Sequence, residues 1–113
     1  MPFVNIMSAH KIGAADRNTL QLEIANNISL LPGKNIDNTV VAITDSYDMF
    51  RSGKPLDGIF VDIRLYKASP EDAKKAMAEK LFEIFDKVLG VPNDRVQLNF
   101  TEMPAWASKG NYF

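Results

Sequence analysis

Residues 3–6 read FVNI, and residues 60–63, which lie 57 positions later, read FVDI. Comparing the chain with itself at this spacing, without gaps, extends the likeness beyond these two stretches. Apolar residues at helical spacing coincide, and so do several special residues: Leu20 with Met77, Ile24 with Leu81, Ile28 with Phe85, Leu31 with Val88, Gly33 with Gly90, Asp37 with Asp94, Thr44 with Thr101, and Asp45 with Glu102. This agreement indicates an internal duplication, with repeats over about residues 2–46 and 58–103.

The two halves have the same predicted order of elements. Strands are expected at residues 3–7, 39–45, 58–66 and 95–101, and helices at 15–31 and 70–89, where apolar residues lie three or four apart. A helix between neighbouring strands favours parallel pairing and a right-handed connection. We therefore predict an α/β fold in which two repeated β-α-β units form a four-stranded mixed sheet with both helices on one face. A ferredoxin-like monomer with antiparallel central strands is the alternative.

The second predicted helix has start and stop signals. Ser69 is placed to cap it, and Pro70 to occupy its first turn. Glu71 and Asp72 would face the positive end of the helix dipole. Gly90 is expected to end the helix, because glycine readily adopts the left-handed conformation found there.

Alternation along the third and fourth predicted strands gives the sheet two different faces. Apolar residues at every second position are expected to meet the helices: Ile59, Val61, Ile63, Leu65, Val96, Leu98 and Phe100. The residues between them lie on the other face: Phe60, Asp62, Arg64, Tyr66, Gln97, Asn99 and Thr101. This second face is too polar for a dry core and too aromatic for a face open to water. We expect other subunits or a binding site to cover it.

The composition is that of one domain over residues 1–113, with 46% hydrophobic and 24% charged residues. The net charge is −1 and no basic cluster is present, so neither nucleic acid nor a membrane surface is expected as a partner. The absence of cysteine excludes disulfides and thiolate chemistry. No apolar run reaches about 18 residues, and no leader-like segment opens the chain. A cytoplasmic location is expected, with leaderless secretion as the alternative.

Pro2 directly follows the initiator position. A small second residue generally permits removal of Met1, which would expose Pro2 as a free secondary amine. An α-amino group titrates at about 7.7–8.0, and burial or nearby cations lower that value. Such an amine can act as a general base at neutral pH. The alternative is structural, since proline is tolerated as the first residue of a strand.

A Met-Pro start, a short apolar strand and a duplicated β-α-β order together resemble the tautomerase superfamily over essentially the whole chain. Residues 33–43, GKNIDNTVVAI, are similar to the lysine-bearing loop and second strand of the macrophage migration inhibitory factor (MIF) branch. Residues 93–105, NDRVQLNFTEMPA, are similar to its fourth strand, and TEMPA also resembles the cis-3-chloroacrylic acid dehalogenase branch. The resemblance implies a homotrimer whose three sheets form a barrel, with active sites at subunit interfaces and no cofactor.

The resemblance also implies roles for individual residues. Pro2 would be the catalytic base, and Lys34 would help to hold the substrate carboxylate. Asn99 matches an asparagine that lines the pocket. Tyr66 stands where the backbone N–H meets the substrate, and Gln97 replaces a tyrosine that is common at its position.

Other candidate site residues have two open interpretations. Glu102 matches the glutamate that orients water in the dehalogenase branch, but it could equally be a strand-end carboxylate. Arg64 could bind a second carboxylate or polarise a carbonyl, or it could pair with Asp62 or Glu102. Three C-terminal aromatic residues have no one-for-one match and are expected to form aromatic walls or intersubunit packing: Trp106, Tyr112 and Phe113.

Other kinds of site have little support in the sequence. His10 is the only histidine, and it has no serine or cysteine partner pattern typical of a catalytic triad. One histidine and scattered acidic residues form no recognisable metal-binding motif, so no metal is expected.

These observations predict a keto–enol tautomerase, an isomerase, that acts on a small 2-oxo acid such as phenylpyruvate, provided that Met1 is removed. The first alternative is a cofactor-independent hydratase or dehalogenase of unsaturated acids, with Pro2 protonated and Glu102 activating water. The second is a non-catalytic, cytokine-like trimeric binding protein.

Overall fold

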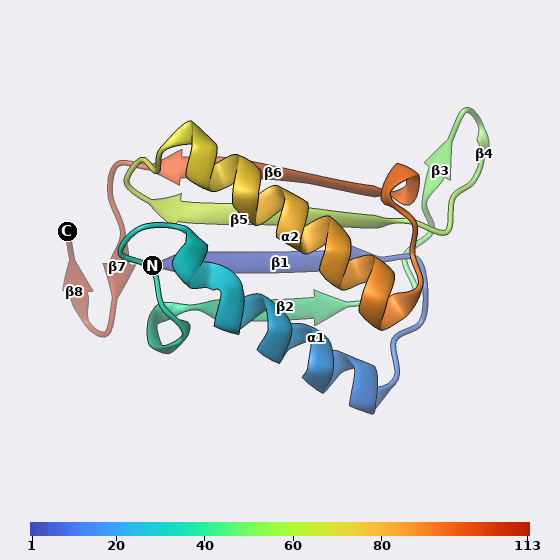
Figure 1. Ribbon diagram of the computed structural model, residues 1–113, viewed down its shortest axis with the longest axis horizontal. Coiled ribbons are helices and arrows are strands. Elements are labelled where there is room, and N and C mark those ends of the chain that lie inside the picture. The colour runs from blue at the N-terminus through green and yellow to red at the C-terminus, as the bar shows by residue number, and fades with distance from the viewer.

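A four-stranded sheet carries both long helices on one face in the computed structural model, which describes residues 1–113 (Figure 1). The main elements are β1 (Pro2–Ser8), α1 (Ala14–Asn27), β2 (Val40–Thr44), β5 (Ile59–Tyr66), α2 (Glu71–Leu89) and β6 (Val96–Met103). The strand order is β2-β1-β5-β6. The outer pairs β1–β2 and β5–β6 are parallel, and the central pair β1–β5 is antiparallel.

The mixed sheet predicted from the sequence is therefore confirmed. The ferredoxin-like alternative is wrong, although its central strands are also antiparallel. In that fold each β-α-β unit is split by another strand, whereas here both strands of each unit are direct neighbours. No helix combines the length and the apolar character that crossing a bilayer would require.

Two short hairpins complete the structure, and periodicity did not predict them. The first is β3 (Phe50–Arg51) with β4 (Lys54–Pro55), and the second is β7 (Ala107–Ser108) with β8 (Asn111–Tyr112). Both turn residues of each hairpin have positive φ, with values of 56° and 72° in the first and 53° and 81° in the second. Positive φ at both central residues is typical of the type I′ turn. The two hairpins lie at opposite ends of the sheet (Figure 1).

The elements recur at the spacing found in the sequence. Helix α1 begins at Ala14 and α2 at Glu71, 57 positions later. The same spacing relates two 3₁₀ turns, η2 (Ile36–Asn38) and η3 (Asn93–Arg95), and it relates the two hairpins, β3–β4 and β7–β8. The structural repeat thus extends beyond residue 103, through the C-terminal hairpin.

The core lies between the helices and the sheet. Alternate residues of β1 and β5 are fully buried there: Val4, Ile6, Val61, Ile63 and Leu65. Their helical partners are also fully buried: Leu20, Ile24, Met77, Leu81 and Phe85. In β6, Val96 is buried, and Leu98 and Phe100 pack against the core. The predicted assignment of faces is confirmed, and each fully buried Leu or Ile stabilises the fold by about 1.5–3 kcal/mol.

The helix ends differ in part from the predictions. Gly90 ends α2 with φ of 67°, and its N–H donates to the Asp86 carbonyl, as expected. Ser69 does not cap α2, because the helix starts after Pro70 and no side chain caps it. Helix α1 ends at Asn27 instead of continuing to Leu31, because the chain tightens into a 3₁₀ turn, η1 (Ile28–Leu30).

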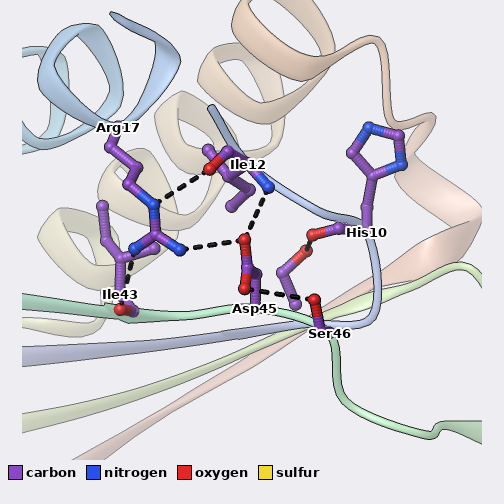
Figure 2. Close-up of polar contacts among 7 residues, drawn as sticks. His10, Ile12, Arg17, Ile43, Asp45 and Ser46 are labelled. Atoms are coloured by element: carbon purple, nitrogen blue, oxygen red, sulfur yellow. Dashed lines mark hydrogen bonds and ion pairs between the residues drawn. The ribbon is translucent and has the colours of Figure 1, made fainter. Parts of the chain in front are cut away.

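A carboxylate at the end of β2 ties the loop before α1 to the sheet (Figure 2). Asp45 accepts the Ile12 N–H at 2.8 Å and pairs with the Arg17 guanidinium at 2.9 Å. Arg17 also donates to the carbonyl oxygens of Ile12 and Ile43. The Ile12 N–H, with further help from Arg17, holds the pKa of Asp45 below its usual value.

Candidate functional site

A cavity of about 470 Å³ opens at the N-terminal end of β1. Pro2, Arg64 and Trp106 are among its lining residues. The others are Met1, Phe3, Asn38, Val40, Met103, Ala107 and Ser108. This cavity, called the Pro2 cavity below, brings together the start of β1, the end of β6 and the second hairpin.

Pro2 begins β1 and is buried, paired across the sheet with Leu65. As the first residue of a strand, it costs the sheet no ladder hydrogen bond. The preceding Met1 carbonyl oxygen accepts the Tyr66 backbone N–H at 3.3 Å. Burial, followed by the charge of Lys34 and a hydrogen bond to it, lowers the pKa of the Met1 α-amino group.

Lys34, in the loop that follows α1, does not line the Pro2 cavity but reaches Tyr66 and the α-amino group of Met1 beside it. Gly33, with φ of 77°, makes the turn that presents it. The Lys34 ammonium donates to the Tyr66 carbonyl oxygen at 2.8 Å. Since an ammonium has three N–H donors, two are available to an oxyanion beside Pro2. Lys34 and the Tyr66 N–H therefore place positive polarity around Met1, which lines the cavity.

Aromatic rings lie close to this end of the sheet. The Tyr66 and Phe113 rings have centroids 5.1 Å apart and planes tilted by 56°. Phe113 and Trp106 exchange two backbone hydrogen bonds of 2.8 Å, which hold the two ends of the hairpin β7–β8 together. The Lys67 ammonium lies 5.2 Å from the centre of the Tyr66 ring. Of the three C-terminal aromatic residues, Trp106 lines the Pro2 cavity, whereas Phe113 does not line it and Tyr112 is 80% exposed.

Arg64 pairs with Asp62, as one of the two interpretations predicted, and its position leaves the other one open. It lines the Pro2 cavity, and its side chain is 56% exposed. One guanidinium nitrogen lies 3.6 Å from an Asp62 carboxylate oxygen. A pair this exposed is weak, so the guanidinium can turn to an anion in the cavity.

Glu102 does not face the Pro2 cavity, which it does not line. Its carboxylate accepts the Ser69 backbone N–H and pairs with the Lys74 ammonium at 3.1 Å. The Ser69 N–H and Lys74 hold the pKa of Glu102 below its usual value. These contacts favour the strand-end interpretation of Glu102 over a role with water.

The contacts of Glu102 repeat those of Asp45, 57 positions earlier. Each carboxylate ends the second strand of its unit, accepts an N–H from the loop before the helix, and pairs with a cation in the first helical turn. The matched groups are Asp45 with Glu102, the Ile12 N–H with the Ser69 N–H, and Arg17 with Lys74. A carboxylate with the same role in both units belongs to the fold, because only one unit begins with Pro2.

Gln97 and Asn99 are not brought to Pro2 within one chain. Gln97 lies beside Phe60 near the start of β6, at the opposite end of the sheet from Pro2, and Asn99 lies beside Asp62 in the middle. Both side chains are exposed on the face without helices. For either to reach a Pro2 cavity, a second copy of the chain would have to bring it there.

Besides Met1, the sequence analysis missed six residues of the Pro2 cavity: Phe3, Asn38, Val40, Met103, Ala107 and Ser108. Asn38 and Val40 lie in the GKNIDNTVVAI stretch, two and four residues beyond Ile36. The strand pairing of Phe3 with Val40 carries them to the cavity. The predicted parallel pairing of the first two strands could have identified Asn38 and Val40, because it sets them beside the start of β1.

No protein-family model and no curated protein matches the sequence. The structure is similar to Leishmania major MIF2, with a TM-score of 0.91 and 18% identity over 100% of this chain and 97% of that one. The chain has the MIF/tautomerase fold. The resemblance that the sequence suggested is confirmed at the level of the fold.

Two other solved structures share this tautomerase fold. One is Pt0534 inactivated by 2-oxo-3-pentynoate, with a TM-score of 0.79 and 14% identity over 89% of this chain and 85% of that one. The other is an asymmetric trimer of a fused 4-OT, F6, with a TM-score of 0.85 and 12% identity over 96% of this chain and 94% of that one. The fold therefore occurs in trimers and in a protein that a 2-oxo acid inactivates.

Proposed function

We propose that this protein is a homotrimeric member of the tautomerase superfamily and a keto–enol tautomerase of a small 2-oxo acid such as phenylpyruvate, active once the initiator Met1 is removed. The position of Met1 carries the proposal. Its carbonyl carbon is bonded to the Pro2 nitrogen, and its carbonyl oxygen receives the Tyr66 N–H at 3.3 Å. Its α-amino group lies near enough to Lys34 for that cation to lower its pKa.

The space that Met1 fills is therefore suited to a small oxygen-bearing substrate. A substrate there touches the Pro2 nitrogen, an N–H donor and an ammonium at the same time. Loss of Met1 turns the Pro2 nitrogen from a tertiary amide, whose lone pair is delocalised, into a secondary amine. Burial and the charge of Lys34, which lower the pKa of the Met1 amine, would act on the Pro2 amine in the same direction. A pKa near neutrality suits a general base.

The reaction needs only one proton to move. The Pro2 amine takes a proton from C3 of the 2-oxo acid, and the electrons of that C–H bond form the C2=C3 double bond. The carbonyl π electrons move to oxygen, which becomes an enolate, and the Pro2 ammonium returns its proton to that oxygen. In this arrangement the Tyr66 N–H meets the developing enolate oxygen, and a fixed donor at such a place lowers the barrier. Lys34 and Arg64 hold the carboxylate.

An aromatic substrate agrees with the lining of the Pro2 cavity. Six of its ten lining residues are hydrophobic, including Trp106. The cavity is large enough, at about 470 Å³, for a phenyl ring and a 2-oxo acid group. Arg64 supplies a second cation for the carboxylate.

The contacts of Glu102 disfavour the hydratase or dehalogenase alternative. A carboxylate that activates water must face the reacting carbon, and Glu102 instead accepts the Ser69 N–H and pairs with Lys74. That alternative would need another base, and no carboxylate lines the Pro2 cavity.

A covalent probe tests the proposed amine directly. The alkyne of 2-oxo-3-pentynoate is conjugated with its carbonyl, so a free amine can add to it. A C–N bond forms, one alkyne π bond breaks, and the amine proton moves to the neighbouring carbon. We expect one probe on Pro2, found by peptide mapping, with loss of phenylpyruvate tautomerase activity in proportion to labelling. Labelling of lysines alone, with activity retained, would contradict the proposal.

A further inference from the structure

The Met1–Pro2 peptide bond lies where the chain enters the interior of the sheet. Strand β1 has β2 on one side and β5 on the other, so neither of its edges is free (Figure 1). Pro2 is buried and paired with Leu65, and Phe3 pairs with residues of both neighbouring strands. The bond that must break to expose the Pro2 amine is therefore followed directly by paired backbone.

Met1 itself continues the pairing of β1 with β5 by one contact. Its carbonyl oxygen accepts the Tyr66 N–H at 3.3 Å, beyond the last ladder pair, which joins Pro2 to Leu65. In the other repeat the Gly58 carbonyl oxygen accepts the Ala9 N–H at 2.9 Å in the same way. A retained Met1 is thus held in the sheet like a residue in the interior of the chain.

The α-amino group of Met1 is also partly enclosed. Burial is the main reason that its pKa lies below the usual value, and the charge of Lys34 lowers that pKa further. Met1 as a whole is only partly exposed, and it lines the Pro2 cavity. An enzyme that recognises an N-terminal methionine has to surround both the amine and the side chain. Neither can be surrounded while Met1 stays in this cavity.

Removal of Met1 is a hydrolysis. Water adds to the Met1 carbonyl carbon, the bond from that carbon to the Pro2 nitrogen breaks, the nitrogen gains a proton, and free methionine leaves. Negative charge develops on the carbonyl oxygen, and a hydrolase has to place its own metal ion or hydrogen-bond donor there. In the folded chain that oxygen already accepts the Tyr66 N–H. Cleavage therefore requires the start of β1 to leave the sheet.

Leaving the sheet is unfavourable because β1 is anchored in the core. Val4 and Ile6 are fully buried and belong to the main hydrophobic cluster. A strand anchored in this way opens only in a small fraction of molecules, whereas chain ends without such contacts open freely. The growing chain has no such protection, because β1 is synthesised before β2 and long before β5.

We propose that the Met1–Pro2 bond is a processing site that can be cleaved only before β1 pairs with β2 and β5. A chain that folds with Met1 in place keeps it, and its own N-terminal residue then occupies the Pro2 cavity. Each chain is thus fixed as active or inactive during its synthesis. That consequence for activity rests on the proposed tautomerase function, whereas the timing of cleavage depends only on the position of Met1 in the sheet.

The test compares two times of exposure to the same enzyme. The chain is made in a reconstituted translation system that contains peptide deformylase, and methionine aminopeptidase is added either during synthesis or after folding. Intact mass gives the fraction of chains that retain Met1. We expect removal of Met1 during synthesis, and removal at least about a hundredfold more slowly from the folded protein, because cleavage then follows the small fraction of opened molecules.

An extended variant is the matched control. It carries Met-Pro-Gly-Ser-Gly-Ser before the native Pro2, so that the same Met-Pro bond lies on a flexible tail outside the sheet. Aminopeptidase added after folding should cleave this variant at least about a hundredfold faster than the folded parent. Val4→Ala removes buried contacts near the start of β1 and should speed cleavage of the folded protein by about tenfold.

Two results would overturn the proposal. One is removal of Met1 from the folded parent as fast as from the extended variant. The other is retention of Met1 when the aminopeptidase is present throughout synthesis, because the bond would then not be a processing site. Both results come from mass and not from tautomerase rates. Met1-free protein without activity would instead contradict the proposed function, while the measured timing of cleavage would still support the proposal made here.

Discussion

The Met1 carbonyl oxygen accepts the backbone N–H of Tyr66 at 3.3 Å, beside the Pro2 nitrogen on which the proposed reaction depends. The equivalent contact in the other repeat joins Gly58 to Ala9. Loss of one residue before Pro2 would free both an amine and the Tyr66 N–H, whereas the chain is continuous through Gly58. Only the Pro2 end of the repeated sheet could therefore present a free amine.

Lys34→Ala is expected to raise KM for phenylpyruvate more than it lowers kcat. Lys34 would hold the carboxylate in both the ground state and the transition state, and loss of such uniform binding appears mainly in KM. Steady-state kinetics of enol formation provide the measurement, with Lys75→Ala as the matched control. Unchanged constants for Lys34→Ala would leave that lysine with only its structural contact to the Tyr66 carbonyl oxygen.

Glu102→Gln is expected to lower the melting temperature at pH 7. It should leave kcat within about twofold, because Glu102 takes no part in the acid–base step, to which a positioned group contributes a rate factor of roughly 10²–10⁴. The pKa of Glu102 is lower in the folded protein than in the unfolded one, because of the Ser69 N–H and then Lys74. The stabilisation of the fold by Glu102 is therefore present at pH values above its pKa in the unfolded chain, about 4.3. It is lost as the pH falls through the pKa in the folded protein.

The melting curves of Glu102→Gln and the parent should accordingly converge in acid. Glu79→Gln is the control, because Glu79 is exposed on α2 and has no ion pair. A loss of activity of about a hundredfold in well-folded Glu102→Gln would instead support the water-activating alternative, because loss of an acid–base group typically slows a reaction by roughly 10²–10⁴.

Deletion of Phe113 is expected to lower kcat/KM for phenylpyruvate more than for pyruvate. Phe113 makes two backbone hydrogen bonds with Trp106 and a ring contact with Tyr66, so its loss loosens the aromatic side of the site. A lost aromatic contact is worth about 0.5–1.5 kcal/mol beyond its area. The measurement is kcat/KM with both substrates. An equal loss of kcat/KM for the two would show that Phe113 supports the fold without contacting the phenyl ring of the substrate.

The protein is expected to be a trimer in dilute solution. The sheet face without helices includes Phe60, which is only partly buried, and the charged pair Asp62 and Arg64. Gln97 and Asn99 can reach a Pro2 cavity only from another copy. Native mass spectrometry at micromolar concentration should show three chains, and a monomer there would remove both residues from the proposed active site.

Much of the fold could be predicted because each half of the chain carries the same patterns. The alternation in β5 and the helical spacing of Leu20, Ile24 and their counterparts fixed the faces that are buried. The hairpins were missed, since strands of two residues have no periodicity. Their turn signals, Ser52-Gly53 and Lys109-Gly110, were nevertheless present at the repeat spacing.

Less of the candidate site could be predicted from the sequence. The contact between Lys34 and Tyr66 joins residues 32 positions apart, and it depends on the antiparallel pairing of β1 with β5. The contacts of Glu102 with Ser69 and Lys74 depend on where the end of β6 meets the start of α2. Such contacts require the register of the strands, which patterns along the chain do not specify.

The rate of phenylpyruvate tautomerisation by samples of known N-terminus tests the account most directly. Intact mass would establish whether Met1 is absent or retained in each preparation, and Pro2→Ala would supply the variant without the proline amine. We predict activity in the Met1-free protein and rates at least about tenfold lower in the other two, since a positioned acid–base group contributes roughly 10²–10⁴. Full activity in protein shown to retain Met1 would contradict the proposed role of the Pro2 amine.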